Sequence, residues 1–115
     1  MFLSGRFVVV QSHGIQALLD ILKRQDAPLF MKGLAAATVA ILAWESINAK
    51  ALAHAGGVEV LVSLLHDSMR APPDIRIAAS TAIASLANDA ECRAILGRTA
   101  GVELLVRMCT YNIAV

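Results

Sequence analysis

The stretch Gly57-Val-Glu-Val-Leu-Val-Ser-Leu-Leu65 decides the fold, because its pattern occurs three times. The other copies are Gly14-Ile-Gln-Ala-Leu-Leu-Asp-Ile-Leu22 and Gly101-Val-Glu-Leu-Leu-Val-Arg-Met-Cys109, at spacings of 43 and 44 residues. In each copy a glycine and a β-branched residue lead into apolar residues at i, i+3, i+4 and i+7, the pattern of an amphipathic helix. A repeat of this length is typical of solenoid proteins.

A second helical element lies between these copies. Leu34–Ala43 and Ala78–Ala87 align at a spacing of 44 residues, and each follows proline, at Pro28 and at Pro72-Pro73. Proline suits the first turn of a helix, where its missing N–H has no partner in any case. Since these helices are apolar or small on nearly every side, we expect them to be buried between neighbours.

A third, shorter element precedes each glycine, at Val8–Gln11, Ala51–His54 and Ile95–Arg98. The glycines at 14, 56–57 and 101 are expected to end this short helix and to allow a sharp turn into the next one. Each unit is therefore predicted to contain a short, a medium and a long helix.

Polar residues suggest where the short helices begin. Ser4, Ser46 and Asn88 are the expected N-caps. Asn88 and Glu91 also have the spacing of a capping box.

Ala55–Leu65 and Arg76–Ala87 resemble the armadillo segments "AGG(I/V)xxLVxLL" and "xxAAxALxNLA", and residues 13–42 form a looser copy. The resemblance covers nearly the whole chain. It implies an all-α fold, a right-handed α-solenoid of armadillo-type three-helix repeats. The HEAT family is the alternative, because Asp74-Ile-Arg76 before alanines could belong to it, but the glycine-led three-helix unit favours armadillo.

The phase of the repeat predicts one armadillo-repeat segment. Repeat 1 is expected over residues 4–44, repeat 2 over 46–87, a partial repeat 3 over 88–109 without its long helix, and a tail over 110–115. Solenoids need about three repeats and polar caps at their ends. We therefore expect exposed apolar patches at both ends, where further armadillo repeats or self-association would cover them, in a longer array or a truncated isoform.

Composition argues against several functions. The 10 basic and 9 acidic residues are spread along the chain and aromatic residues make up 4%, so we expect no nucleic-acid partner. The apolar run Gly33–Trp44 is too short to span a membrane. Because Arg6 interrupts Met1–Val10, a signal peptide is not expected. An intracellular location, cytoplasmic or nuclear or both, follows.

No catalytic or metal site is expected. His13, His54 and His66 have no second ligand at i+3 or i+4. Cys92 and Cys109 are not in a ligand spacing, so we expect two free thiols in helices. The sequence predicts no enzyme activity and no cofactor.

The armadillo resemblance implies a concave groove on the long helices that binds a protein or an extended peptide. In that family an asparagine ladder lines the groove, with tryptophan four residues earlier in importin-alpha-type members. Here Ile41 and Ser85 occupy the asparagine places, and Ala37 and Thr81 the tryptophan places. The resemblance therefore does not predict recognition of nuclear signals.

The groove is expected to be apolar on one long helix, polar on the next and flanked by two cations. The side chains expected there are Lys32, Ala37, Ile41, Trp44, Glu45, Arg76, Thr81, Ser85 and Asn88. The alternative places Ile41 in the core and Trp44 under the following short helix, and we favour this packing for Trp44 because large aromatic residues are usually buried. We also expect Lys32 and Arg76 to be solvated surface charges rather than binding groups.

The function that follows is a protein–protein interaction scaffold. The alternative is a regulatory or structural spacer segment of a larger multidomain protein whose activity lies outside this chain. Both rest on the resemblance in fold more than on any single residue.

Overall fold

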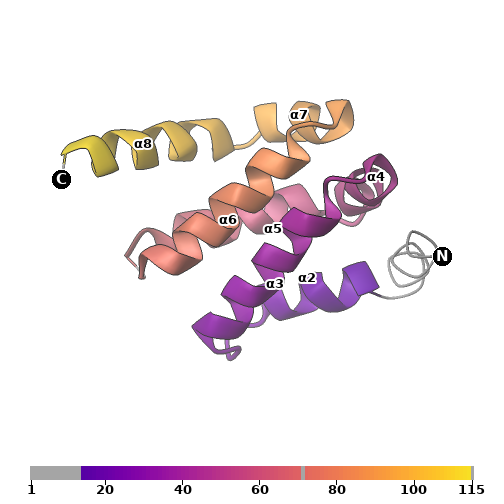
Figure 1. The fold of residues 1–115 in the computed structure, drawn as a ribbon, viewed down its shortest axis with the longest axis horizontal. Helices are drawn as coiled ribbons and strands as arrows, with labels where there is room; N and C mark the ends of the chain where they lie inside the picture. Colours follow the sequence, from indigo (N-terminus) through magenta and orange to yellow (C-terminus); the bar gives the residue numbers. More distant parts are fainter. Residues whose placement is uncertain (1–13, 71, 115) are drawn as a thin grey trace.

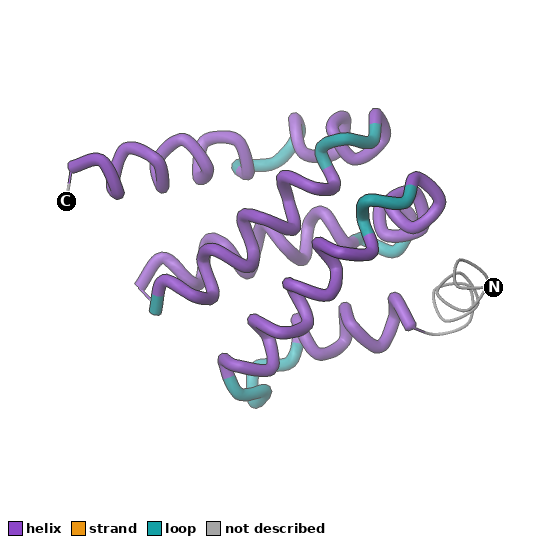
Figure 2. Tube along the Cα trace, in the orientation of Figure 1, coloured by secondary structure: helices purple, strands orange, loops and turns teal. Residues whose placement is uncertain are grey.

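The computed structural model describes residues 14–70 and 72–114, with side chains for 14–69 and 72–110. These ranges contain seven α-helices and no strand (Figures 1 and 2). The helices are α2 (Ile15–Lys23), α3 (Leu29–Leu42), α4 (Ser46–His54), α5 (Gly57–Asp67), α6 (Pro73–Leu86), α7 (Ala90–Gly97) and α8 (Gly101–Ala114), with a 3₁₀ turn at Ser68–Arg70. The predicted all-α class is confirmed.

The order of helix lengths follows the sequence pattern. From α2 to α7 the helices have 9, 14, 9, 11, 14 and 8 residues, so α3 and α6 are the long helices of this range. Helix α8, at the place of a medium helix, also has 14 residues. Pro28 is the N-cap of α3, and Pro73 is the first residue of α6. Proline therefore starts both long helices, as predicted.

Helices at equivalent places of successive units lie against one another. Helix α3 packs on α6, α2 on α5, α4 on α7, and α5 on α8. Figure 1 shows the long helices α3 and α6 side by side in front, with α2 and α5 behind them. The core therefore lies between the row of long helices and the row of medium helices.

Small residues let the long helices approach closely. In α3, Ala36 and Val39 are fully buried, and Gly33 faces α6. A Cβ added at Gly33 would lie 2.9 Å from Cδ1 of Ile75. The alanine-rich pattern of the long helices thus sets the spacing between them.

The glycines before the medium helices differ in backbone conformation and in the space around them. Gly56 has φ +83°, in the left-handed region that favours glycine, and a Cβ on Gly57 would lie 2.9 Å from the carbonyl oxygen of Leu52. Gly101 has no positive φ, but a Cβ there would lie 3.0 Å from Cγ2 of Val62. Gly14 has φ −61°. Within the described residues, the predicted sharp turn therefore uses a left-handed glycine only at Gly56.

The predicted N-caps of α4 and α7 are wrong by one residue. Glu45 precedes α4, so Ser46 is its first helical residue. Asp89 caps α7, and its carboxylate accepts a hydrogen bond from the backbone N–H of Cys92 at 3.1 Å. Asn88 instead donates from Nδ2 to the carbonyl oxygen of Ser85 at 3.2 Å, so it ends α6. The expected capping box is therefore absent there, and the expected cap at residue 4 lies outside the described residues.

Helix α8 continues to Ala114, so the expected helix end near Cys109 and the tail from residue 110 are wrong. No glycine or proline interrupts residues 102–114. The hydroxyl of Thr110 donates to the carbonyl oxygen of Val106 at 3.0 Å, within the helix.

Apolar side chains are exposed at the last unit, as predicted. Val102 is 52% exposed, whereas Val58, its equivalent in α5, is 1% exposed. The reason is that α6 packs on α5, while the described chain has no long helix after α8. At the other end, α3 exposes Met31 and Leu34.

Among the described helices, none is long and apolar enough to cross a bilayer.

Candidate functional site

A groove of about 460 Å³ runs between α3 and α6, and we call it the α3–α6 groove. Its lining residues are Ala37, Ala40, Ile41, Trp44, Asp74, Ile77, Ala78, Thr81 and Ser85. The structure thus brings together the side chains at 37, 41, 44, 81 and 85, which the sequence placed on one surface. Three of the other lining residues, Asp74, Ile77 and Ala78, come from the first half of α6.

Ile41 and Trp44 are exposed, so the alternative that buried both, which we favoured for Trp44, is wrong. Trp44 is 74% exposed and Ile41 61%. The buried positions beside them are filled by Ala40 and Ala43. Helix α4 packs against α5 and α7, and Trp44 remains exposed to solvent.

The exposed apolar surface of α3 extends beyond the predicted residues. Phe30 is 73% exposed and Leu34 is 67% exposed. With Ala37, Ile41 and Trp44 they form one row along α3 and the turn after it, which we call the α3 row. Leu34 also lines a smaller hollow between α2 and α3. Its steps of four, three, four and three residues were visible in the sequence, but Phe30 and Leu34 could equally have faced the core.

The opposite wall of the groove is mixed, because Asp74, Thr81 and Ser85 are polar whereas Ile77 and Ala78 are apolar. Thr81 is exposed and Ser85 is buried, and both present hydroxyl groups. Asp74 is the only charged residue among those that line the groove. Asn88, predicted to lie here, sits beyond the wall and bonds the end of α6.

The two predicted cations do not flank this groove, and neither is a fully solvated charge. Arg76 is half-buried, and its Nη1 lies 3.5 Å from the carbonyl oxygens of Ser68 and Met69, near the end of α5. Lys32 is half-buried in a different hollow. Glu45 is half-buried at the start of α4 and does not line the groove.

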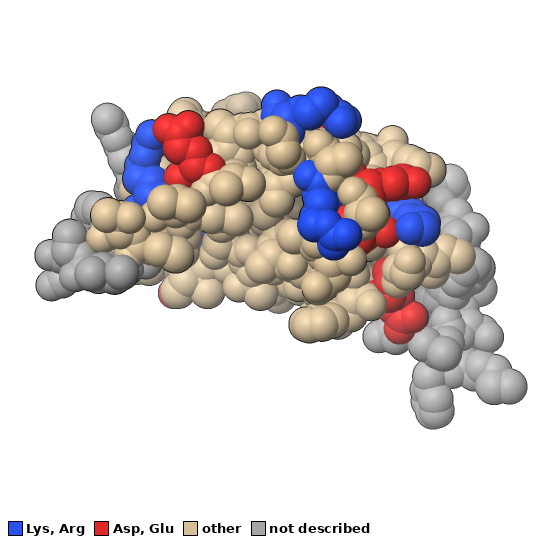
Figure 3. Space-filling view, turned by 90° about the horizontal axis from the view of Figure 1, so that it is seen from above, with Lys and Arg blue, Asp and Glu red and all other residues tan. Residues whose placement is uncertain are grey.

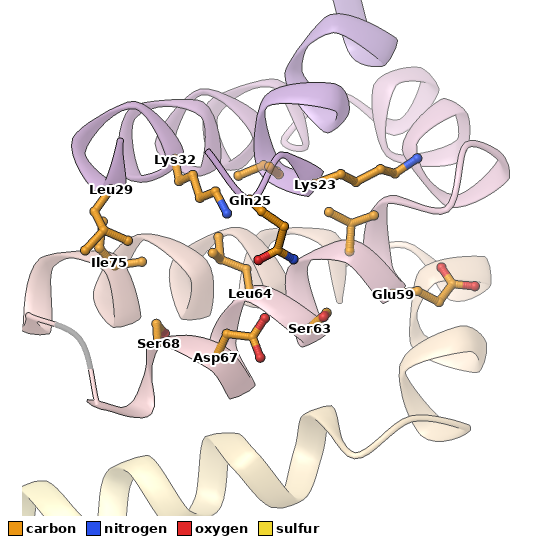
Figure 4. Close-up of a pocket in the computed structure, with 12 residues that line it drawn as sticks. Lys23, Gln25, Leu29, Lys32, Glu59, Ser63, Leu64, Asp67, Ser68 and Ile75 are labelled. Atoms are coloured by element: carbon orange, nitrogen blue, oxygen red, sulfur yellow. The ribbon is translucent and has the colours of Figure 1, made fainter. Parts of the chain in front are cut away.

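The hollow beside Lys32 was not predicted. It has a volume of about 720 Å³ and lies between the α2–α3 turn and α5. In Figure 4, Gln25 and Lys32 point toward the wall that carries Asp67. The remaining lining residues are Leu22, Lys23, Leu29, Glu59, Val60, Ser63, Leu64, Ser68 and Ile75. Two lysines and two carboxylates balance one another, so the hollow has no preference for one sign of charge.

Two ion pairs connect the short helices α4 and α7. Lys50 Nζ lies 2.9 Å from Oδ1 of Asp89, and the pKa of Asp89 is lowered, chiefly by this hydrogen bond. The same contact raises the pKa of Lys50. His54 Nε2 lies 3.0 Å from Oε2 of Glu91, between α4 and α7. These pairs connect neighbouring short helices.

The two cysteines of the chain differ in their surroundings. Burial raises the pKa of the Cys92 thiol to about 12, so this thiol is protonated at neutral pH and is a poor nucleophile. Cys109 is exposed in α8. No group of three His, Cys, Asp or Glu side chains within the described ranges could hold a metal ion.

Charge is mixed on the surface shown in Figure 3. Lys and Arg side chains lie beside Asp and Glu side chains in small groups, with uncharged surface between them. This face has no patch of one sign that would attract a polyanion.

Comparison of the chain with models of protein families, with curated proteins and with solved structures finds no match. The interpretation of the site therefore rests on its own residues. Contiguous exposed apolar side chains rimmed by polar ones mark interaction surfaces. The α3–α6 groove and the α3 row have this character, and the charge-balanced hollow does not.

Proposed function

We propose that the chain is a segment of an intracellular protein-interaction scaffold, built from armadillo-type repeats, whose α3–α6 groove binds a segment of a partner protein. The observation that carries the proposal is the exposure of Phe30, Leu34 and Ile41 along α3 and of Trp44 in the turn that follows it. Its action is binding, without catalysis by this chain.

Removal of apolar side chains from water would drive the binding. Each large apolar side chain that is removed from water contributes about 1.5–3 kcal/mol. A partner that covers the α3 row would gain this for several side chains at once, less the cost of association. Trp44 stands at the end of the groove, and tryptophan is enriched among the residues that dominate binding energy.

The armadillo-type arrangement is supported by three observations. The helix order matches short, medium and long helices per unit. Equivalent helices of successive units pack on each other. The left-handed Gly56 turns the chain from α4 into α5. Cys92 and Cys109 are both free, which suits a reducing compartment.

The exposed valines of α8 favour a second role, as a spacer in a longer stack. Val102 and Val106 are exposed where their equivalents in α5, Val58 and Val62, are buried. A further unit with a long helix would cover them. This role needs no ligand in the α3–α6 groove.

Quantitative affinity capture separates the two roles. The tagged chain, a Trp44→Ala variant and an Ile41→Asp variant are used to capture proteins from cell extract. Ile47→Asp is the matched control, because Ile47 is also exposed but lies on α4, away from the groove. The scaffold proposal predicts proteins that both groove variants lose and the control retains. If the three variants retain the same proteins, the groove is not the binding surface.

A further inference from the structure

The spacing of the side chains in the α3 row indicates which kind of partner can pack against this row. Steps of four and three residues form a narrow apolar seam, the arrangement that packs against a second helix in coiled coils. Phe30, Leu34, Ile41 and Trp44 supply the large side chains of the seam, and Ala37 lies at its centre. The seam covers 14 residue steps, or about 21 Å at the rise of an α-helix.

The groove beside the seam can receive large side chains. Ala37, Ala40 and Ala78 are among its lining residues, and Ile41 and Ile77 stand at its sides. Small residues between large ones form holes for the side chains of a partner helix. The volume of about 460 Å³ leaves room for more than one such side chain.

Backbone hydrogen bonding argues against an extended occupant. A strand-like peptide brings unpaired N–H and C=O groups, and leaving these groups buried without partners is costly. The groove offers few polar side chains to such a backbone, namely Asp74, Thr81 and Ser85. An α-helix satisfies its backbone internally and needs few polar partners from the groove.

The negative charge of the groove favours an occupant with a basic side chain. Asp74, at the second position of α6, is exposed and is the only charged residue of the lining. A basic side chain on the flank of the occupant would complement it.

We infer that the occupant of the α3–α6 groove is an amphipathic α-helix of about four turns, with a 4-3 row of large apolar residues and a basic residue beside it. The inference rests on the proposed function, since it assumes that the groove binds a protein segment.

Two synthetic peptides test the inference. One is a helix of about four turns with leucines at 4-3 spacing and a lysine on the flank. The other has the same composition except for a central proline, which breaks the helix but allows an extended chain. Affinity is measured by fluorescence anisotropy, and helicity of the bound peptide by circular dichroism.

The helical peptide is expected to bind, with Ile41→Asp weakening it about tenfold or more and Ile47→Asp leaving it unchanged. The proline peptide should bind at least about tenfold more weakly. Asp74→Lys should weaken binding of the lysine peptide and strengthen binding of a glutamate version. Because Ile41 and Asp74 are exposed, these variants should keep the thermal melting of the parent chain, which is checked first.

Other outcomes overturn the inference in distinguishable ways. If the proline peptide binds as tightly as the helix, the occupant is extended and only the inference fails. A dimer of the chain that Ile41→Asp abolishes would assign the groove to a second copy. If neither peptide binds while capture from extract still depends on Ile41, the helix inference fails and the scaffold function stands. If capture is also independent of Ile41, both fail.

Discussion

The two long helices, α3 and α6, occupy equivalent places in the stack and yet present different surfaces to solvent. Where α3 has Phe30, Ile41 and Trp44, α6 has Asp74, Ser85 and Asn88. Their buried faces are alike, since Ala35, Val39 and Leu42 correspond to Ala79, Ile83 and Leu86, all buried. Packing therefore restricts the side chains on one face of each long helix. The side chains on the exposed face can differ between the two helices, and this face is available for binding.

The largest expected effect lies on the shared buried face. Leu86→Ala removes a fully buried side chain of α6 and should lower the free energy of unfolding by about 2–5 kcal/mol. Ile41→Ala, on the exposed face of α3, should change it by no more than about 0.5 kcal/mol. Urea denaturation followed by circular dichroism measures both. Similar losses for the two variants would contradict the division into buried and exposed faces.

A smaller effect is expected where the two long helices touch. Gly33→Val should destabilise the chain by about 1–3 kcal/mol, because a Cβ at this position meets Ile75 and the larger side chain overpacks the contact. Gly97→Val is the matched control, since among the described atoms none lies within 4 Å of the added Cβ. Shortening the neighbour with Ile75→Ala should make the substitution at Gly33 less costly. Without such coupling, this contact does not set the helix spacing.

The caps of the two short helices offer a subtler comparison. Asp89→Ala should cost about 0.5–2 kcal/mol at neutral pH, because it removes the cap of α7 and the partner of Lys50. Glu45→Ala removes no side-chain cap of α4, so the loss of a helix cap is expected only for Asp89→Ala.

The contribution of Asp89 should also depend on pH. Its pKa is lowered below 3.8 in the folded chain, so the folded state binds fewer protons than the unfolded state. The stabilisation is therefore complete above the unfolded pKa of about 4 and is lost as pH falls through the lowered pKa. Denaturation of the parent chain and of Asp89→Ala at a series of pH values should show the difference between them shrinking only in acid. A difference that is constant down to strong acid would contradict the lowered pKa.

The smallest expected effect concerns the cysteines of the last unit. Cys109 should react with a thiol reagent in the native chain, because it is exposed. Cys92 should react only after denaturant is added, because it is buried and its pKa is raised to about 12. Mass spectrometry of the labelled chain counts the modified sites, and rapid native labelling of Cys92 would show that α7 opens readily.

Much of the fold follows from residues that act locally. The prolines at 28 and 73 mark the starts of α3 and α6, and Gly56 marks the turn into α5. The period of 43 or 44 residues then indicates which helices are equivalent, and equivalent helices do pack together. These predictions succeed because capping, turn geometry and helical periodicity are properties of neighbouring residues.

Other features depend on residues far apart in the chain. Helix α3 is apolar on nearly every side, so its sequence alone does not say which side meets α6 and which meets water. For this reason the burial that we favoured for Trp44, and gave as an alternative for Ile41, was wrong. The cap of α7 was missed because Asn88 and Asp89 are adjacent candidates, and a lysine 39 residues away, Lys50, binds the second one. The hollow at Gln25 and Asp67 collects residues from separate elements and has no periodic pattern to reveal it.

Trp44 gives the most direct test of the central claim, that the exposed face of α3 is a binding surface. It is the only tryptophan of the chain, so the intrinsic indole emission comes from this residue alone. The free chain should emit like an indole in water, and titration with the leucine–lysine helix should shift the emission to shorter wavelength as Trp44 leaves water. Emission that is already blue-shifted in the free chain, or that stays unchanged while anisotropy shows the peptide bound, would contradict the claim.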